Sequence, residues 1–110
     1  MKIFDCFTYF EEIELLELRL QTVYSVVDFI VLVEANRTFT GKEKEFVFEK
    51  NKHKFSDFLD KIIYIKVENM PISSNPWDLE TYQRNCIMRG LTKVEDQDLV
   101  LISDLDEIPN

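Results

Sequence analysis

Apolar and polar positions in this chain divide it into short apolar runs separated by longer segments with helical spacing. Four apolar runs have the length of strands, at residues 2–7, 28–34, 62–67 and 99–102. Between them, apolar residues recur every three or four positions, which is typical of helices with one buried face. This alternation predicts an α/β fold with right-handed crossovers. We therefore expect a single domain over residues 1–110, with a mostly parallel sheet and helices on both faces.

The first helix is expected to follow the first strand directly. Thr8 and Glu11 have the spacing of a capping box, in which both side chains satisfy amide groups at a helix start. The inward stripe is formed by the apolar positions Ile13, Leu16, Leu20, Val23 and Val27. The face toward water is assigned to the polar residues Glu17, Arg19 and Gln21.

The later helices are predicted from spacing and from capping residues. The phenylalanines and leucine between residues 49 and 61 have helical spacing and predict a helix lying on the sheet. Another helix is expected to begin with Asn75 as N-cap and Pro76 in the first position. It is expected to run to about Val94, although Gly90 is unfavourable inside a helix.

The composition indicates a folded domain and argues against nucleic acid as a partner. Apolar residues make up 45% of the chain, and the formal net charge of −8 opposes binding to a phosphate backbone. No apolar run approaches the roughly 20 residues of a membrane span. Because charges interrupt the first residues, we expect no signal peptide and a cytoplasmic location. Cys6 and Cys86 lack neighbouring zinc ligands, so we expect reduced, buried thiols.

The candidate for chemistry is the acidic stretch that follows the last apolar run. Leu99–Ile102 is expected to be a strand buried on both faces, and Asp104, Asp106 and Glu107 come directly after it. Open α/β sheets bind ligands beyond the carboxyl ends of their strands. An Asp-x-Asp unit directs two carboxylates roughly the same way, and Mg²⁺ prefers such oxygen ligands. Acidic turns are also commonly solvated, but this position favours a cation shared with a diphosphate.

Several other polar residues have two open interpretations. Glu34 ends the second apolar run, where it either caps a neighbouring helix or bonds a bound nucleoside. Lys42 and Lys44 belong to a solvated, mobile loop or approach a phosphorylated ligand. Arg84 and Asn85 are surface residues of the last helix, or the guanidinium points at a diphosphate. No glycine-rich phosphate loop follows the first strand, so any nucleotide is held by acids, metal and side chains.

Segments spread in order over nearly the whole chain carry a family resemblance. They are Phe4–Phe7, Glu12–Leu20, Val27–Phe29, Val33–Glu34, Phe39–Lys42, Phe58–Ile63, Trp77–Asn85 and Ser103–Pro109. The most specific are the triplet Gln83-Arg84-Asn85 and the ending Ser103–Pro109. Together these segments resemble glycosyltransferase family 17, which includes the β-1,4-mannosyl-glycoprotein β-1,4-N-acetylglucosaminyltransferase.

The resemblance implies a GT-A-like, Rossmann-like fold, of which these residues are the N-terminal, donor-binding part in a truncated sheet. It implies transfer of a sugar from a UDP-sugar, UDP-N-acetylglucosamine, to a glycan acceptor. Asp104 and Asp106 would hold a divalent cation, Mn²⁺ or Mg²⁺. The nucleotide-sugar would be contacted by Thr8, Glu34, Arg84, Asn85 and Asp104. The catalytic base stays unassigned.

Two other classes of function remain open. A non-catalytic fragment of this fold would act as a nucleotide-sugar-binding or assembly module. Whichever class applies, self-association into a homo-oligomer is expected, because a truncated sheet exposes an edge strand and apolar helix faces. A phosphatase with an aspartyl nucleophile also uses Asp-x-Asp after a strand. It is disfavoured because its motif would be expected early in the chain.

Overall fold

Four parallel strands form the centre of the structure, in the order β3-β2-β1-β4. The computed structural model describes residues 1–38, 42–71 and 75–107. The strands are β1 (Ile3–Tyr9), β2 (Phe29–Ala35), β3 (Ile62–Val67) and β4 (Leu99–Ile102). The predicted α/β class with a parallel, Rossmann-like sheet is confirmed.

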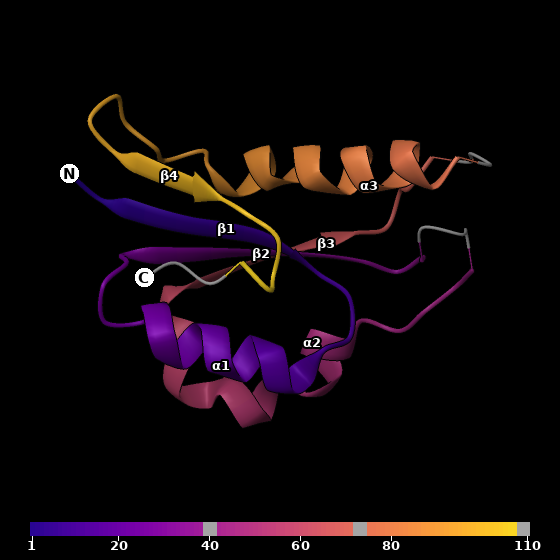
Figure 1. The fold of residues 1–110 in the computed structure, drawn as a ribbon, viewed down its shortest axis with the longest axis horizontal. Helices are drawn as coiled ribbons and strands as arrows, with labels where there is room; N and C mark the ends of the chain where they lie inside the picture. Colours follow the sequence, from indigo (N-terminus) through magenta and orange to yellow (C-terminus); the bar gives the residue numbers. More distant parts are fainter. Residues whose placement is uncertain (39–41, 72–74, 108–110) are drawn as a thin grey trace.

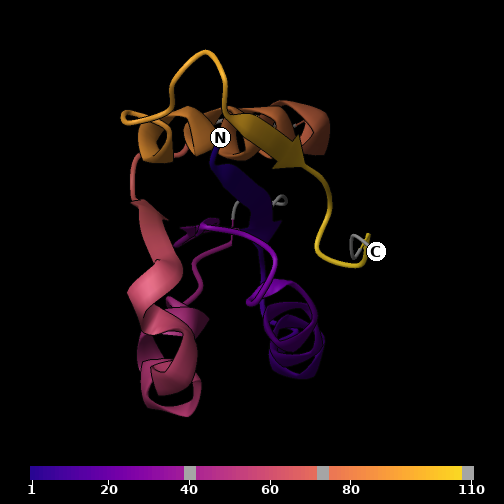
Figure 2. The same cartoon turned by 90° about the vertical axis from the view of Figure 1, so that its left-hand side faces the viewer.

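Helical segments cover both faces of this sheet, as Figure 1 and the turned view in Figure 2 show. One face carries α1 (Ile13–Val23), α2 (Val47–Lys50) and the 3₁₀ helix η1 (Lys52–Lys61). The other face carries α3 (Pro76–Asn85) and the 3₁₀ helix η2 (Cys86–Gly90). Alternate residues of β1 and β2 point to opposite faces, so each face has its own apolar cluster.

The last strand differs from its prediction. β4 lies at one edge of the sheet, where it pairs with β1. Leu99 is 43% exposed and Ile102 is 53% exposed, so the strand is not buried on both faces. Its apolar residues resemble those of a central strand, but the order of strands depends on crossovers that local pattern does not encode.

The start of the first helix was predicted too early. β1 continues through Tyr9, so Thr8 belongs to the strand and makes no capping box with Glu11. α1 begins at Ile13, with Glu12 in the N-cap position and without a hydrogen bond from that side chain to the helix. The sheet register with β2 extends the strand over the residues that local spacing assigned to a cap.

The other helices are shorter than predicted. The expected helix over residues 49–61 is divided into α2 and η1, and Phe55 has non-helical angles (φ −115°, ψ 22°) inside η1. The predicted cap of α3 is confirmed, because Asn75 Oδ1 accepts a hydrogen bond from the Trp77 amide at 3.1 Å. That α-helix ends at Asn85, well before Val94, and continues as η2.

Gly90, the last residue of η2, lies against the side chains of β2 and β3. A Cβ atom at this position would lie 2.6 Å from Val31 Cγ1. We expect Gly90→Ala to lower the free energy of unfolding by about 1–3 kcal/mol, because overpacking outweighs the better helix propensity of alanine. Urea denaturation measures the effect, and Val31→Ala, which truncates a fully buried side chain, should cost less in the Gly90→Ala background than in the wild type. Wild-type stability of Gly90→Ala would contradict the close approach.

The structure also bears on the predictions for the two cysteines and for membrane-spanning segments. Cys6 and Cys86 are free and buried, as predicted, and burial raises the pKa of the Cys6 thiol to about 12. In the described ranges, none of the helices has both the length and the apolar character needed to cross a membrane. The segments Phe39–Gly41 and Ile108–Pro109 of the family resemblance lie outside the described residues.

Candidate functional site

A hollow of about 400 Å³ opens at the carboxyl ends of β1 and β4. Thr8 lines it from β1, and Asp104 and Asp106 line it from the turn after β4. Its other walls come from the start of α1 and from α3, through Glu12, Leu15, Glu80 and Gln83. This edge is where open α/β sheets bind ligands. Three of the residues predicted for the site therefore share one concave surface.

The Asp104–Asp106 turn places its central residue in the core and its two aspartates at the hollow. After β4 the chain turns toward the face covered by α1 (Figures 1 and 2), and Leu105 is 6% exposed in the apolar cluster there. Asp104 Oδ1 accepts a hydrogen bond from Arg84 Nη2 at 2.7 Å. Among the residues that the structure describes, none bonds to the Asp106 carboxylate.

Arg19, predicted to face water, is fully buried beneath this turn. Its Nε and Nη2 atoms donate to the two carboxylate oxygens of Asp5, at 3.0 and 2.6 Å. Asp5 is also fully buried, and the Phe7 ring lies 4.3 Å from the guanidinium carbon. The remaining donors of Arg19 go to the turn after β4. An ion pair inside the core therefore supports the wall of the hollow.

A signal for the burial of Arg19 was present in the spacing of α1. The residue follows Leu16 by three positions and precedes Val23 by four, so it falls within the apolar stripe. The polarity of the side chain led to the wrong assignment to the outer face. A charge on such a stripe is expected only where a buried partner compensates it, and that partner, Asp5, lies on another element.

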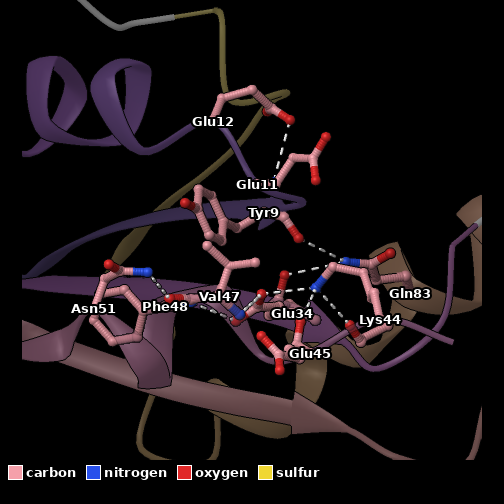
Figure 3. Close-up of polar contacts among 12 residues, drawn as sticks. Tyr9, Glu11, Glu12, Glu34, Lys44, Glu45, Val47, Phe48, Asn51 and Gln83 are labelled. Atoms are coloured by element: carbon pink, nitrogen blue, oxygen red, sulfur yellow. Dashed lines mark hydrogen bonds and ion pairs between the residues drawn. The ribbon is translucent and has the colours of Figure 1, made fainter.

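Glu34 is fully buried and caps α2 (Figure 3). Its Oε1 accepts hydrogen bonds from the Phe48 amide at 3.0 Å and the Tyr64 hydroxyl at 2.7 Å. Its Oε2 accepts from the Val47 amide at 2.6 Å and from Lys44 Nζ at 2.8 Å. These contacts match the helix-capping interpretation. A nucleoside hydroxyl would have to displace one of four donors, since a carboxylate has about four lone-pair sites, and that contact stays a prediction.

Lys44 is not the mobile loop cation that its surroundings predicted. Besides Glu34, its ammonium group donates to the carbonyl oxygens of Ala35 at 3.0 Å and Glu45 at 2.8 Å (Figure 3). Its side chain is only 10% exposed. The buried charge of Glu34 explains this position, because an ionised carboxylate inside a protein requires a partner.

Gln83 connects α3 to the carboxyl ends of two strands (Figure 3). Its Nε2 donates to the carbonyl oxygens of Tyr9 at 3.4 Å and Val33 at 3.2 Å, and its side chain is buried. This role was not predicted, although Gln83 lies four residues from both Leu79 and Ile87 on the buried stripe. Like Arg19, it is a polar residue on an apolar face.

The predicted donor-binding residues outside the aspartate turn have different positions. Arg84 lies beside the hollow through its contact with Asp104, and Glu80 Oε1 is 3.7 Å from the same guanidinium. Asn85 is exposed at the end of α3, and neither it nor Glu34 lines the hollow. The structure thus brings together Thr8, Arg84, Asp104 and Asp106, and leaves Glu34 and Asn85 apart.

The charged side chains that line the hollow in the described part of the chain are all acidic: Glu12, Glu80, Asp104 and Asp106. Tyr9 also lines it, and its hydroxyl has no hydrogen-bond partner within the described parts of the chain. Burial, with the charge of Glu34 as a second cause, raises the pKa of the Tyr9 hydroxyl above its ordinary value, so the group stays neutral. Such a wall attracts cations and disfavours a bare anion.

A divalent cation fits the two aspartates as a partial ligand set. In residues 1–38, 42–71 and 75–107, no group of three or more His, Cys, Asp or Glu side chains is arranged to hold a metal ion. Mg²⁺ typically takes one or two carboxylates and completes its shell with water and substrate phosphates. Asp104 and Asp106 would supply two such carboxylates, and metal binding at this turn stays a prediction.

The fold and the hollow define a Rossmann-like α/β domain with a concave surface, lined by four acidic residues, at the carboxyl edge of its sheet. A comparison with protein families identifies it further, because the model of Glycosyltransferase family 17 matches residues 1–110. The chain belongs to glycosyltransferase family 17, and its activity is the transfer of a sugar from a donor to an acceptor. Comparisons with curated proteins and with solved structures found no match.

Proposed function

We propose that this domain binds UDP-N-acetylglucosamine in the hollow and that Asp104 and Asp106 hold Mn²⁺ or Mg²⁺ against the diphosphate. The observation that supports this proposal is the placement of both aspartates on one hollow at the carboxyl edge of a parallel sheet. The cation supplies positive charge that stabilises the departing UDP during transfer to a glycan acceptor. A cytoplasmic location remains part of the proposal.

The charge of the hollow favours a metal-dependent site. Four carboxylates line it, so a diphosphate needs compensating positive charge to bind there. Arg84 supplies one cation beside Asp104, and a planar guanidinium suits phosphate oxygens. Thr8 lines the same hollow from β1, where its side chain is available to a bound nucleotide-sugar. A divalent cation on the aspartates would supply the rest.

Calorimetric titration of UDP-N-acetylglucosamine with Mn²⁺ or with a chelator tests the proposal. We expect binding only with Mn²⁺. The variant Asp104→Asn with Asp106→Asn should weaken it by at least about 10- to 100-fold, the loss that even outer-shell partners of a metal cause. Negligible heats under both conditions would contradict the proposal.

A second Asp-x-Asp unit in the chain provides a matched control. Asp96 and Asp98 lie before β4, at the opposite end of the strand, where Asp98 accepts hydrogen bonds from the amides of Lys2 and Glu95. The variant Asp96→Asn with Asp98→Asn removes the same charge from the chain. Its affinity for UDP-N-acetylglucosamine in Mn²⁺ should equal that of the wild type, so an equal loss in both variants would indicate a general effect of net charge.

A further inference from the structure

We propose that Arg19 is a positioning residue of the donor site, which orients the turn carrying Asp104 and Asp106. The inference rests on the proposed function, because its consequence is a change in cation-dependent nucleotide binding. Arg19 itself does not line the hollow. It is fully buried on α1, beneath the turn, and contacts the backbone carbonyl groups of Asp104 and Leu105, next to Asp106.

The guanidinium divides its donors between β1 and the turn. Arginine has five N–H groups in a rigid plane, and Nε and Nη2 each donate one to Asp5. Nη2 also donates to Ser103 Oγ at 2.7 Å. Nη1 donates to the carbonyl oxygens of Asp104 at 2.7 Å and Leu105 at 3.1 Å, with that of Glu107 at 3.4 Å. One side chain therefore binds three carbonyl groups of the turn.

This arrangement determines which way the turn presents its side chains. The carbonyl groups of Asp104 and Leu105 point toward Arg19, and the Leu105 side chain packs in the cluster on the α1 face. The carboxylates of Asp104 and Asp106 are left at the hollow. Glu107 closes the turn, since its amide donates to Asp104 O at 3.0 Å and its Oε1 accepts from the Asp104 amide at 2.9 Å.

Stability alone does not explain a charged pair at this position. Burying both ions is costly, and an apolar pair of similar volume is often neutral or more stabilising. An apolar side chain cannot donate to three carbonyl groups, however, and lysine would offer a point charge without the planar set of donors. The feature that Arg19 adds is therefore the orientation of the turn, which matters where two carboxylates must share one ligand.

The test measures Mn²⁺-dependent binding of UDP to the 110-residue chain by calorimetry, beside thermal unfolding. The variant Asp5→Leu with Arg19→Met keeps the core filled and removes both charges. We expect it to unfold cooperatively but to bind UDP at least about tenfold more weakly in Mn²⁺, as for outer-shell partners of metals.

Lys61→Met is the matched control. Lys61 Nζ also donates to backbone carbonyl oxygens, those of Tyr24 at 2.6 Å and Val27 at 3.0 Å, but at the amino end of β2. The substitution should lower the unfolding temperature and leave UDP affinity unchanged. If Arg19 had a purely structural role, UDP affinity would fall in proportion to the unfolding temperature both in Lys61→Met and in the Asp5→Leu, Arg19→Met variant.

The outcomes separate the two proposals. If the wild type does not bind UDP with Mn²⁺, the proposed function fails and this inference fails with it. If the wild type binds and the folded Asp5→Leu, Arg19→Met variant binds equally well, only the role of Arg19 is overturned. If that variant does not fold, Ser103→Ala is used to test the role of Arg19. It removes the hydrogen bond between Arg19 and Ser103 Oγ and keeps the Asp5–Arg19 pair. Weaker UDP binding by Ser103→Ala supports the inference, and unchanged binding overturns it.

Discussion

Replacing Asp5 with alanine is expected to lower the free energy of unfolding by about 3–5 kcal/mol, because it leaves the Arg19 guanidinium unpaired inside the core. Both side chains are fully buried, and their charged atoms approach to 2.6 Å. Desolvation of the remaining cation is then no longer offset by a carboxylate. Urea denaturation at neutral pH measures the loss.

An exposed ion pair in the same chain is the control for this prediction. Glu45 lies 3.0 Å from Lys50, with the two side chains 74% and 68% exposed, so Glu45→Ala should cost less than about 1 kcal/mol. Replacing both members of the buried pair, with Asp5→Leu and Arg19→Met, should recover most of the stability lost in Asp5→Ala. If Asp5→Ala and Glu45→Ala lowered the free energy of unfolding equally, breaking the buried ion pair would cost no more than breaking the exposed one.

Replacing Glu34 with glutamine is expected to lower the free energy of unfolding on the order of 2–4 kcal/mol. Four donors converge on the two carboxylate oxygens, from Lys44, Val47, Phe48 and Tyr64. A glutamine amide would place an NH₂ group against two of these donors and remove the charge that Lys44 compensates. Chemical denaturation measures the loss.

Two further variants separate the charge of Glu34 from its individual bonds. Tyr64→Phe removes one of the four donors and should cost about 1 kcal/mol. Glu49→Gln changes an exposed carboxylate that pairs with Lys66 at 3.0 Å and should cost no more than about 1 kcal/mol. Weaker UDP binding by Glu34→Gln at unchanged stability would contradict the capping role and favour the contact with a nucleoside.

The strands and helix starts that were predicted well depend on contacts between near neighbours. The third strand has the predicted bounds, Ile62–Val67, because a short run of β-branched residues needs little context. Asn75 and Pro76 start α3 as expected, since an N-cap satisfies amides only two or three residues away. The position of the two aspartates at the carboxyl edge of the sheet follows in the same way from the order of the elements.

The predictions that were wrong concern residues whose partners are distant in the sequence. Arg19 contacts Asp104 O across 85 positions, and local polarity alone assigned it to the surface. For Lys44, a solvated loop and a phosphorylated ligand were the two predicted surroundings, because nothing nearby in the chain indicates that Glu34 is buried beside it. β4 has the composition of a central strand, yet it lies at the edge of the sheet.

The sequence by itself determined the alternation of strands and helices, the family, and the acidic turn after the last apolar run, because periodicity and motifs are local properties of the chain. Only the tertiary structure decided which polar side chains are buried and which of the candidate residues share a hollow. The physical reason is that a buried charge is stable only beside its partner. For Arg19 and Asp5 that partner comes from another element, so the pairing exists only after the elements pack.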